Sequence, residues 1–175
     1  QKHLTPKTAQ QVNALLGGMS LAFVSTYADE IRSDNRYDHL ATWHYVNIDQ
    51  QARYNEADKN PKGDIVTAIK TCIDTLKNPT ASKEDKVFYL KLLVHFIGDV
   101  HQPFHAGRKE DRGGNSINLF WFGKRTNLHQ LWDTDLIEHY NMSYRELAAH
   151  LPKRTADEKA VVMAAPLLDL SLIHI

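Results

Sequence analysis

Apolar residues recur at helical spacing along most of the first half of the chain. Thr5 and Pro6 form a typical helix start, and the apolar stripe that follows ends at the glycine pair 17–18. A second helical pattern covers residues 21–32. A third, over residues 65–76, places its apolar side chains on one face. This half of the chain is therefore predicted to be built from α-helices.

The second half continues the helical pattern around one segment of a different kind. Ser82 starts a strongly apolar helix that stops before Pro103. Residues 117–127 are typical of a small β-hairpin, and they are the only segment that favours strands. Helical patterns return after Asn127. Because no repeat or linker-like stretch divides the sequence, we expect one all-α domain over residues 1–175 with a single hairpin.

Composition narrows the possible functions. The 175 residues carry 21 basic and 21 acidic side chains, so a long-range basic field is excluded as the main source of nucleic-acid affinity. The single cysteine, Cys72, can form neither an internal disulfide nor a thiolate zinc site, and we interpret it as a small core residue. The apolar run 161–175 is too short to span a bilayer, so no membrane segment is expected.

Histidine is the unusual residue, because half of the ten copies fall within one short stretch of the chain. In that stretch, His95 and Asp99 are four residues apart on an apolar helix, and His129 and Asp133 repeat this spacing. Such a spacing places both side chains on one helix face, where they can bind the same ion. With His105 just beyond the helix end, nitrogen and oxygen donors without thiolate suit Zn²⁺ or another divalent cation.

A structural explanation competes with metal binding. One His–Asp pair at this spacing is commonly a surface ion pair. His95 and Asp99, however, lie in a run whose other residues are nearly all apolar, where burying two ionisable groups costs several kcal/mol unless they are paired or ligated. Two such pairs together with His105 therefore favour a metal site.

Four motifs together resemble a known family, the single-strand-specific zinc nucleases called S-one/P-one nucleases, which are related in fold to zinc-dependent phospholipase C. The motifs are His95-Phe-Ile-Gly-Asp99-Val-His-Gln-Pro-Phe-His105, Asp111-Arg-Gly-Gly-Asn115, Thr126-Asn-Leu-His129-Gln-Leu-Trp-Asp133, and Trp43-His44-Tyr45 preceded by Tyr27-Ala28-Asp29. The resemblance extends from about Leu4 to His150 and includes both the residues and their spacing. It implies a mostly helical fold of the phospholipase C/P-one nuclease type.

The resemblance also implies a zinc cluster. The first zinc would be held by Asp29, His44, His95 and Asp99, and the second by His105, His129 and Asp133. Asp99 would bridge to a third zinc, which an N-terminal tryptophan and a nearby histidine complete in the family. Neither residue stands at the matching place in this sequence, which we interpret as truncated at both ends. Two of the three zinc sites are therefore expected to be complete here.

The same resemblance implies that five residues act on the substrate. Asp29 would orient the attacking water, and Arg32, one helical turn away, would bind phosphate oxygens in the transition state. Asn115 would donate to phosphate, although it can equally be a turn former. Tyr45 would stack on a base and Asn47 would hydrogen-bond the base edge, while core packing is the alternative for Tyr45.

The implied function is hydrolysis of single-stranded DNA and RNA to 5′-phosphate products, with 3′-nucleotidase activity, by a secreted or periplasmic enzyme. No obligate protein partner is evident. Two alternatives remain open: a zinc phospholipase C of the same superfamily, or a metal-stabilised fragment that binds without catalysis. The Tyr45/Asn47 pair and the Gly113-Gly114-Asn115 loop favour nucleotides over phospholipids.

Overall fold

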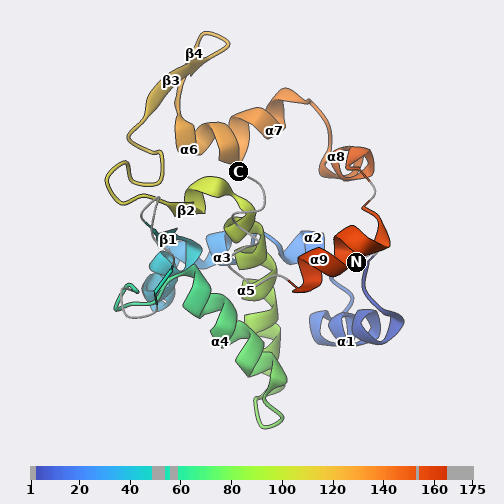
Figure 1. Cartoon of the computed structure of the whole chain (residues 1–175). Coiled ribbons are helices and arrows are strands. Elements are labelled where there is room, and N and C mark those ends of the chain that lie inside the picture. Colours follow the sequence, from blue (N-terminus) through green and yellow to red (C-terminus); the bar gives the residue numbers. More distant parts are fainter. Residues whose placement is uncertain (1–2, 49–53, 56–58, 153, 165–175) are drawn as a thin grey trace. The chain divides into compact units, whose positions relative to one another are not determined.

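The computed structural model describes residues 3–48, 54–55, 59–152 and 154–164. The chain divides into two compact units, one made of residues 1–46 and 56–100 and the other of residues 47–55 and 101–175. The single domain expected from the sequence stays a prediction beside these two units. The elements of both units are helical except for short strands, which confirms the all-α fold class (Figure 1).

Most helices of the first unit begin and end where the sequence predicted. The helices that match are α1 (Pro6–Leu16), α4 (Ile65–Lys77) and α5 (Lys83–His101), whereas α2 (Leu21–Val24) and α3 (Tyr27–Glu30) divide one expected helix. The Thr5 hydroxyl accepts a hydrogen bond from the Thr8 amide at the start of α1, and Gly17 ends the helix with φ +61°. The Ser82 hydroxyl likewise accepts from the Asp85 amide at the start of α5. These local capping signals fixed the helix ends correctly.

The helical stretch expected over residues 21–32 is present but interrupted, because residues 25–26 form a turn between the four-residue helices α2 and α3. After α2, the Ser25 hydroxyl donates to the Ala22 carbonyl, and α3 is followed by the 3₁₀ turn η1 (Ile31–Ser33). Hydroxyl side chains that bond the local backbone compete with continued helix. A ten-residue 3₁₀ helix, η2 (Asn35–His44), follows. As a result, Asp29 and His44 both lie on short elements.

The apolar face of α4 supplies much of the core of the first unit. Ile65, Ile69 and Cys72 on this helix are fully buried, as is Phe96 on α5. Burial raises the pKa of the Cys72 thiol to about 12, so the side chain stays a neutral thiol. The interpretation of Cys72 as a core residue is therefore confirmed.

The second unit holds the shorter elements. They are η4 (Pro103–His105), β2 (Ala106–Gly107), β3 (Asn118–Trp121), β4 (Lys124–Asn127), α6 (Leu128–Gln130), the π-helical turn η5 (Leu131–Asp135), α7 (Leu136–His139), α8 (Tyr144–His150) and α9 (Ala156–Ala164). The strand β1 (Val46–Asn47) joins the two units in the sequence, and the Ile48 amide that follows it donates to the Gly107 carbonyl. The sequence patterns gave no sign of β1, β2 or α9.

The predicted hairpin is confirmed. Strands β3 and β4 pair antiparallel, and Trp121 lies opposite Lys124 across a two-residue turn (Figure 1). Phe122 and Gly123 in the turn have φ values of +46° and +78°, as a turn that matches the twist of a hairpin requires. The C-terminal segment 165–175 lies outside the described residues. Within the described ranges, no helix is both long and apolar enough to cross a membrane.

Candidate metal centres

The first cluster gathers four of the predicted ligands within the first unit. His95 and Asp99 lie one turn apart on α5, His44 ends η2, and Asp29 lies on α3. His44 Nδ1 is 2.9 Å from Asp99 Oδ2, and His95 Nε2 is 3.1 Å from the same oxygen. The two ring nitrogens are 3.2 Å apart. Oxygens of Asp29 lie 3.9 Å from His44 Nδ1 and 3.8 Å from His95 Nε2.

These distances fit a single cation. Four ligand atoms around a tetrahedral zinc, with bonds of about 2.0–2.1 Å, are about 3.3 Å from one another. Asp29, His44 and His95 offer atoms that all lie within 4.8 Å of one another. Both histidines are buried, whereas the side chain of Asp29 is 56% exposed, so solvent reaches the cluster from the Asp29 side.

A hydrogen bond on the far side of His95 fixes which nitrogen faces the cluster. Its Nδ1 lies 2.6 Å from the Ser25 carbonyl oxygen, which can only accept, so Nδ1 carries the proton. The Nε2 of a neutral ring then presents a lone pair to the Asp99 carboxylate. Burial lowers the pKa of His95, but the hydrogen bond and charge of Asp99 outweigh it, and the net pKa is raised. The surroundings of His95 Nε2 therefore favour a bound positive charge, either a proton or a metal ion.

The second cluster repeats this arrangement within the second unit. His129 on α6 and Asp133 on η5 are one turn apart, with 3.1 Å between Nε2 and Oδ2, and His105 on η4 brings its Nε2 within 3.6 Å of Asp133 Oδ1. The two imidazole rings stack, with 5.1 Å between their centres. His129 Nδ1 donates to the Gly113 carbonyl at 2.7 Å, so its Nε2 also presents a lone pair to a carboxylate.

Gln102 holds the carboxylate of this cluster from outside. Its side-chain Nε2 donates to Asp133 Oδ1 at 2.7 Å, and its side-chain Oε1 accepts from the Phe104 amide. Burial acts to raise the pKa of Asp133, but hydrogen bonding with His105, His129 and Gln102 outweighs it and holds the pKa far below its usual range. For His129 such a bond requires a proton on Nε2 as well, in the place that a metal ion would otherwise take. Asp133 is therefore a carboxylate at any ordinary pH, as a metal ligand must be.

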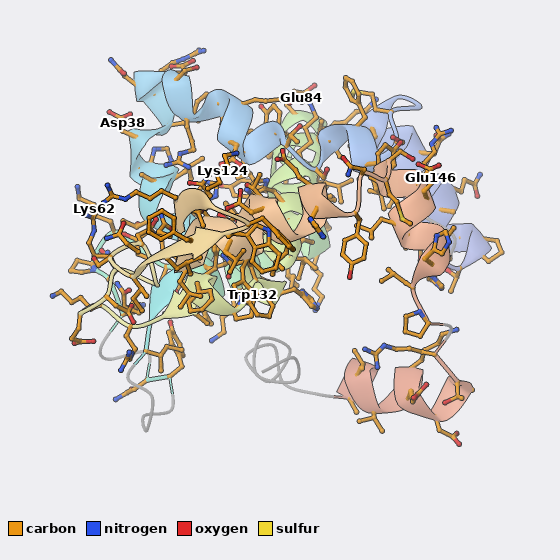
Figure 2. The ribbon with its side chains drawn as sticks, turned by 90° about the horizontal axis from the view of Figure 1, so that it is seen from above. Asp38, Lys62, Glu84, Lys124, Trp132 and Glu146 are labelled. Carbon is orange, nitrogen blue, oxygen red and sulfur yellow. The ribbon has the colours of Figure 1, made fainter. Side chains whose placement is uncertain are left out.

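The glycine loop after β2 packs tightly beside the second cluster. Gly113 has φ +58°, and a Cβ built there would lie 2.6 Å from the Phe104 carbonyl oxygen. The loop is closed by Asp111, which accepts from the Gly114 amide at 3.0 Å; this bond, with help from Arg108, lowers the pKa of Asp111. The Phe104 ring also meets the edge of Trp132, which follows Leu131 on η5 and is labelled in Figure 2.

The predicted substrate residues are all at least partly exposed. Arg32 Nη1 lies 3.3 Å from Asp29 Oδ1, which places a guanidinium at the exposed edge of the first cluster. Tyr45 directly follows His44 and is 38% exposed, and Asn47 is exposed on β1. Asn115 is exposed, and its side chain donates to the Arg112 carbonyl at 3.0 Å, as the turn-former interpretation expects.

The sequence patterns missed three residues that support the ligands. Ser25 and Gly113 act through backbone carbonyls, which leave no side-chain signal in a sequence. Gln102 lies inside the motif between His95 and His105, and this position was the only sign in the sequence that it could support a ligand. The glycine pair 113–114 was recognised, but as a turn rather than as the support of His129.

Fold and clusters together define a helical protein with two candidate metal-binding clusters of histidines and carboxylates. Comparison with known families then identifies it: the S1/P1 Nuclease model matches residues 1–166, and the chain belongs to that family. It is 33% identical to Endonuclease 4 of Arabidopsis thaliana over 81% of this chain and 50% of the relative. It is 32% identical to Nuclease P1 of Penicillium citrinum over 77% and 52%, and 30% identical to Nuclease S1 of Aspergillus oryzae over 75% and 48%. The chain thus spans about half the length of these relatives.

Proposed function

We propose that this chain carries the metal centres of a zinc-dependent endonuclease that cleaves single-stranded DNA and RNA to 5′-phosphate products and also hydrolyses 3′-nucleotides. One observation carries the proposal. In each cluster a histidine with its proton bound to a backbone carbonyl turns a lone pair toward a carboxylate 3.1 Å away. Two acceptors at that distance repel each other unless a proton or a metal ion lies between them, and the further ligand atoms gathered beside each pair favour a metal ion.

Zinc is the cation that these donors suit best. The first site would use Asp29, His44, His95 and Asp99, and the second His105, His129 and Asp133. Imidazole nitrogen and carboxylate oxygen without thiolate are typical of catalytic zinc. When bound, zinc lowers the pKa of a coordinated water and neutralises charge on a phosphate.

Asp29 and Arg32 would handle water and phosphate at the exposed edge of the first cluster. Asp29 approaches both histidines from the solvent side, so one carboxylate oxygen can accept a hydrogen bond from the attacking water and orient it. Arg32, whose side chain is 59% exposed, can turn from Asp29 to the non-bridging phosphate oxygens. Its charge is most valuable in the transition state, where the negative charge on phosphorus oxygens increases.

Single-strand preference would follow from base stacking next to the first cluster. Tyr45 is joined to the ligand His44 and keeps part of its ring accessible. A base can stack on such a ring only when it has left its own duplex stack, which costs a few kcal/mol in paired DNA. In this proposal Asn47 reads the base edge and Asn115 donates to phosphate.

The decisive experiment compares substrates on zinc-loaded protein. The 175-residue chain, and a version extended by the N-terminal segment of a family relative, are given one labelled oligonucleotide as single strand, as duplex and as RNA, then a 3′-nucleotide and a phosphatidylcholine. Faster cleavage of single strands, with 5′-phosphate ends that a ligase can join, supports the proposal. Hydrolysis of phosphatidylcholine alone would indicate a phospholipase C. Zinc binding without turnover in either version would indicate a binding fragment.

The family resemblance also supports a location outside the cytoplasm, secreted or periplasmic. Fractionation of the source cells, with the protein detected in medium or periplasm, tests this part of the proposal separately.

A further inference from the structure

The N-terminus of α4 holds the residues on both sides of His44. The Trp43 indole Nε1 donates to the Lys62 carbonyl at 3.0 Å, and the Ile65 amide donates to the Tyr45 carbonyl at 3.1 Å. Lys62, labelled in Figure 2, and Ile65 are therefore tied to the chain immediately before and after the histidine. All of these contacts lie within the first unit.

The anchor itself is rigid. Asp64 begins α4 with a capping box, in which its carboxylate accepts from the Thr67 amide at 2.9 Å while its own amide donates to Thr67 Oγ1 at 2.9 Å. Asp64 is 2% exposed and Ile65 is completely buried. A capped, buried helix start cannot shift without breaking these bonds.

Gly63 leaves the space that the Trp43 indole occupies. Its φ is +89°, and a Cβ added there would lie only 2.7 Å from Trp43 Nε1 and 3.3 Å from Thr67 Oγ1. No side chain larger than hydrogen fits without moving the indole, since Thr67 is itself part of the capping box. The close approach of backbone and ring thus depends on glycine.

His44 also packs edge-on against the ring of Phe96, with 5.2 Å between the ring centres. It is the last residue of a 3₁₀ helix, an element with poor hydrogen-bond geometry, and Tyr45 after it is extended. Its Nδ1 must nevertheless lie within 2.9 Å of Asp99 and 3.2 Å of His95. A shift of the Trp43 backbone would reach His44 directly, because one peptide bond joins the two residues.

We propose that Gly63 is a positioning residue for the first metal site: it lets α4 hold Trp43, and through it His44, so that the site binds zinc tightly. This inference rests on the zinc sites of the proposed function but adds residues outside the ligand set. Groups that only orient a metal ligand usually affect metal affinity by about 10–100-fold. We expect Gly63→Ala to weaken zinc at the first site by a factor in that range and to leave the second site unchanged.

Gly18 provides a matched control. Its φ of +88° equals that of Gly63 within a degree, so alanine suffers the same backbone strain, but nothing lies within 4 Å of its added Cβ. Zinc is titrated against a competing chelator in the parent, Gly63→Ala and Gly18→Ala, and His129→Ala identifies the component that belongs to the second site. A selective loss in Gly63→Ala, absent in Gly18→Ala, supports the inference.

A second variant keeps the test decisive if Gly63→Ala does not fold. Trp43→Phe removes the Nε1–H donor together with the pyrrole part of the indole and keeps one aromatic ring, so a several-fold loss of first-site affinity is expected. Equal weakening of both sites, or no change at the first site in either folded variant, would overturn the inference. If the parent itself binds no zinc, the proposed function fails instead, so the two failures are distinguishable.

Discussion

Replacing Gln102 with leucine should weaken zinc binding at the second cluster without unfolding the protein. Gln102 donates to Asp133 Oδ1 at 2.7 Å and accepts from the Phe104 amide, which precedes the ligand His105. Leucine keeps the size of the side chain and removes both bonds. Asp133 then loses an amide donor that helps to orient it toward the two histidines.

The size of the effect follows from the exposure of the carboxylate. A hydrogen bond to a charged group contributes about 1.5–3 kcal/mol, and because Asp133 is 37% exposed, water replaces part of the lost bond. We therefore use the lower end, about 1.5 kcal/mol, which corresponds to roughly tenfold in zinc affinity. The partly buried Phe104 amide also loses its acceptor, which should lower stability by about 1 kcal/mol.

The assay measures zinc affinity and stability separately. Chelator competition gives the dissociation constant at each cluster, and thermal unfolding of the zinc-free protein gives the change in stability. Gln130→Leu is the control, because Gln130 is an equally polar, exposed residue next to His129 and makes no side-chain hydrogen bond to the described residues. A second-cluster affinity within twofold of the parent in Gln102→Leu would refute the reasoning.

Three further predictions follow from the same contacts. Chelation should lower the melting temperature strongly, because the cation between facing acceptors is lost in both clusters; an unchanged melting curve in excess chelator would contradict this. In an active, zinc-loaded form, Arg32→Ala should lower kcat by roughly 10²–10³ with zinc content intact, whereas Arg36→Ala, a surface control that pairs with Asp34, should leave kcat unchanged. Because hydrogen bonding and charge lower the pKa of Asp111, its contribution to stability is present above its unfolded value of about 3.8 and is lost as pH falls through the folded value. Arg108→Ala should return that pKa only partly toward 3.8 in a carboxyl NMR titration, because the Gly114 amide remains.

Local signals account for what the sequence predicted well. The hydroxyl caps at Thr5 and Ser82 each act within three residues, and each forms the expected bond to the backbone of its own helix. The spacing of His95 and Asp99 needed only one helical turn to bring them to one face. Predictions of this kind succeed because they depend on nothing distant in the chain.

The failures share a different cause, dependence on distant or backbone partners. The break after Ser25 places the Ser25 carbonyl against His95, seventy residues further along the chain, and no local pattern announces such a contact. The hydrogen bond from the Ile48 amide to the Gly107 carbonyl also joins residues far apart in the sequence. The gathering of these histidines and carboxylates into clusters, in contrast, was predictable from motif content, because only a few residue types can act as metal ligands, whereas any residue can supply a backbone carbonyl.

The two clusters support their histidines in the same way, although the supporting residues differ in type. In each, the ligand histidine of an i, i+4 pair donates Nδ1–H to a backbone carbonyl, from Ser25 in one and Gly113 in the other. The carbonyl fixes the tautomer that turns Nε2 toward the carboxylate, and any residue type can provide it. The sequence must instead supply the backbone path that brings the carbonyl to the histidine. For the first cluster this is the interruption of the helix at Ser25, whose hydroxyl bonds the Ala22 carbonyl. For the second it is Gly113, which has a positive φ and packs against Phe104. For a substitution near either cluster, the change in backbone path should therefore matter more for the position of the histidine than the change in side-chain chemistry.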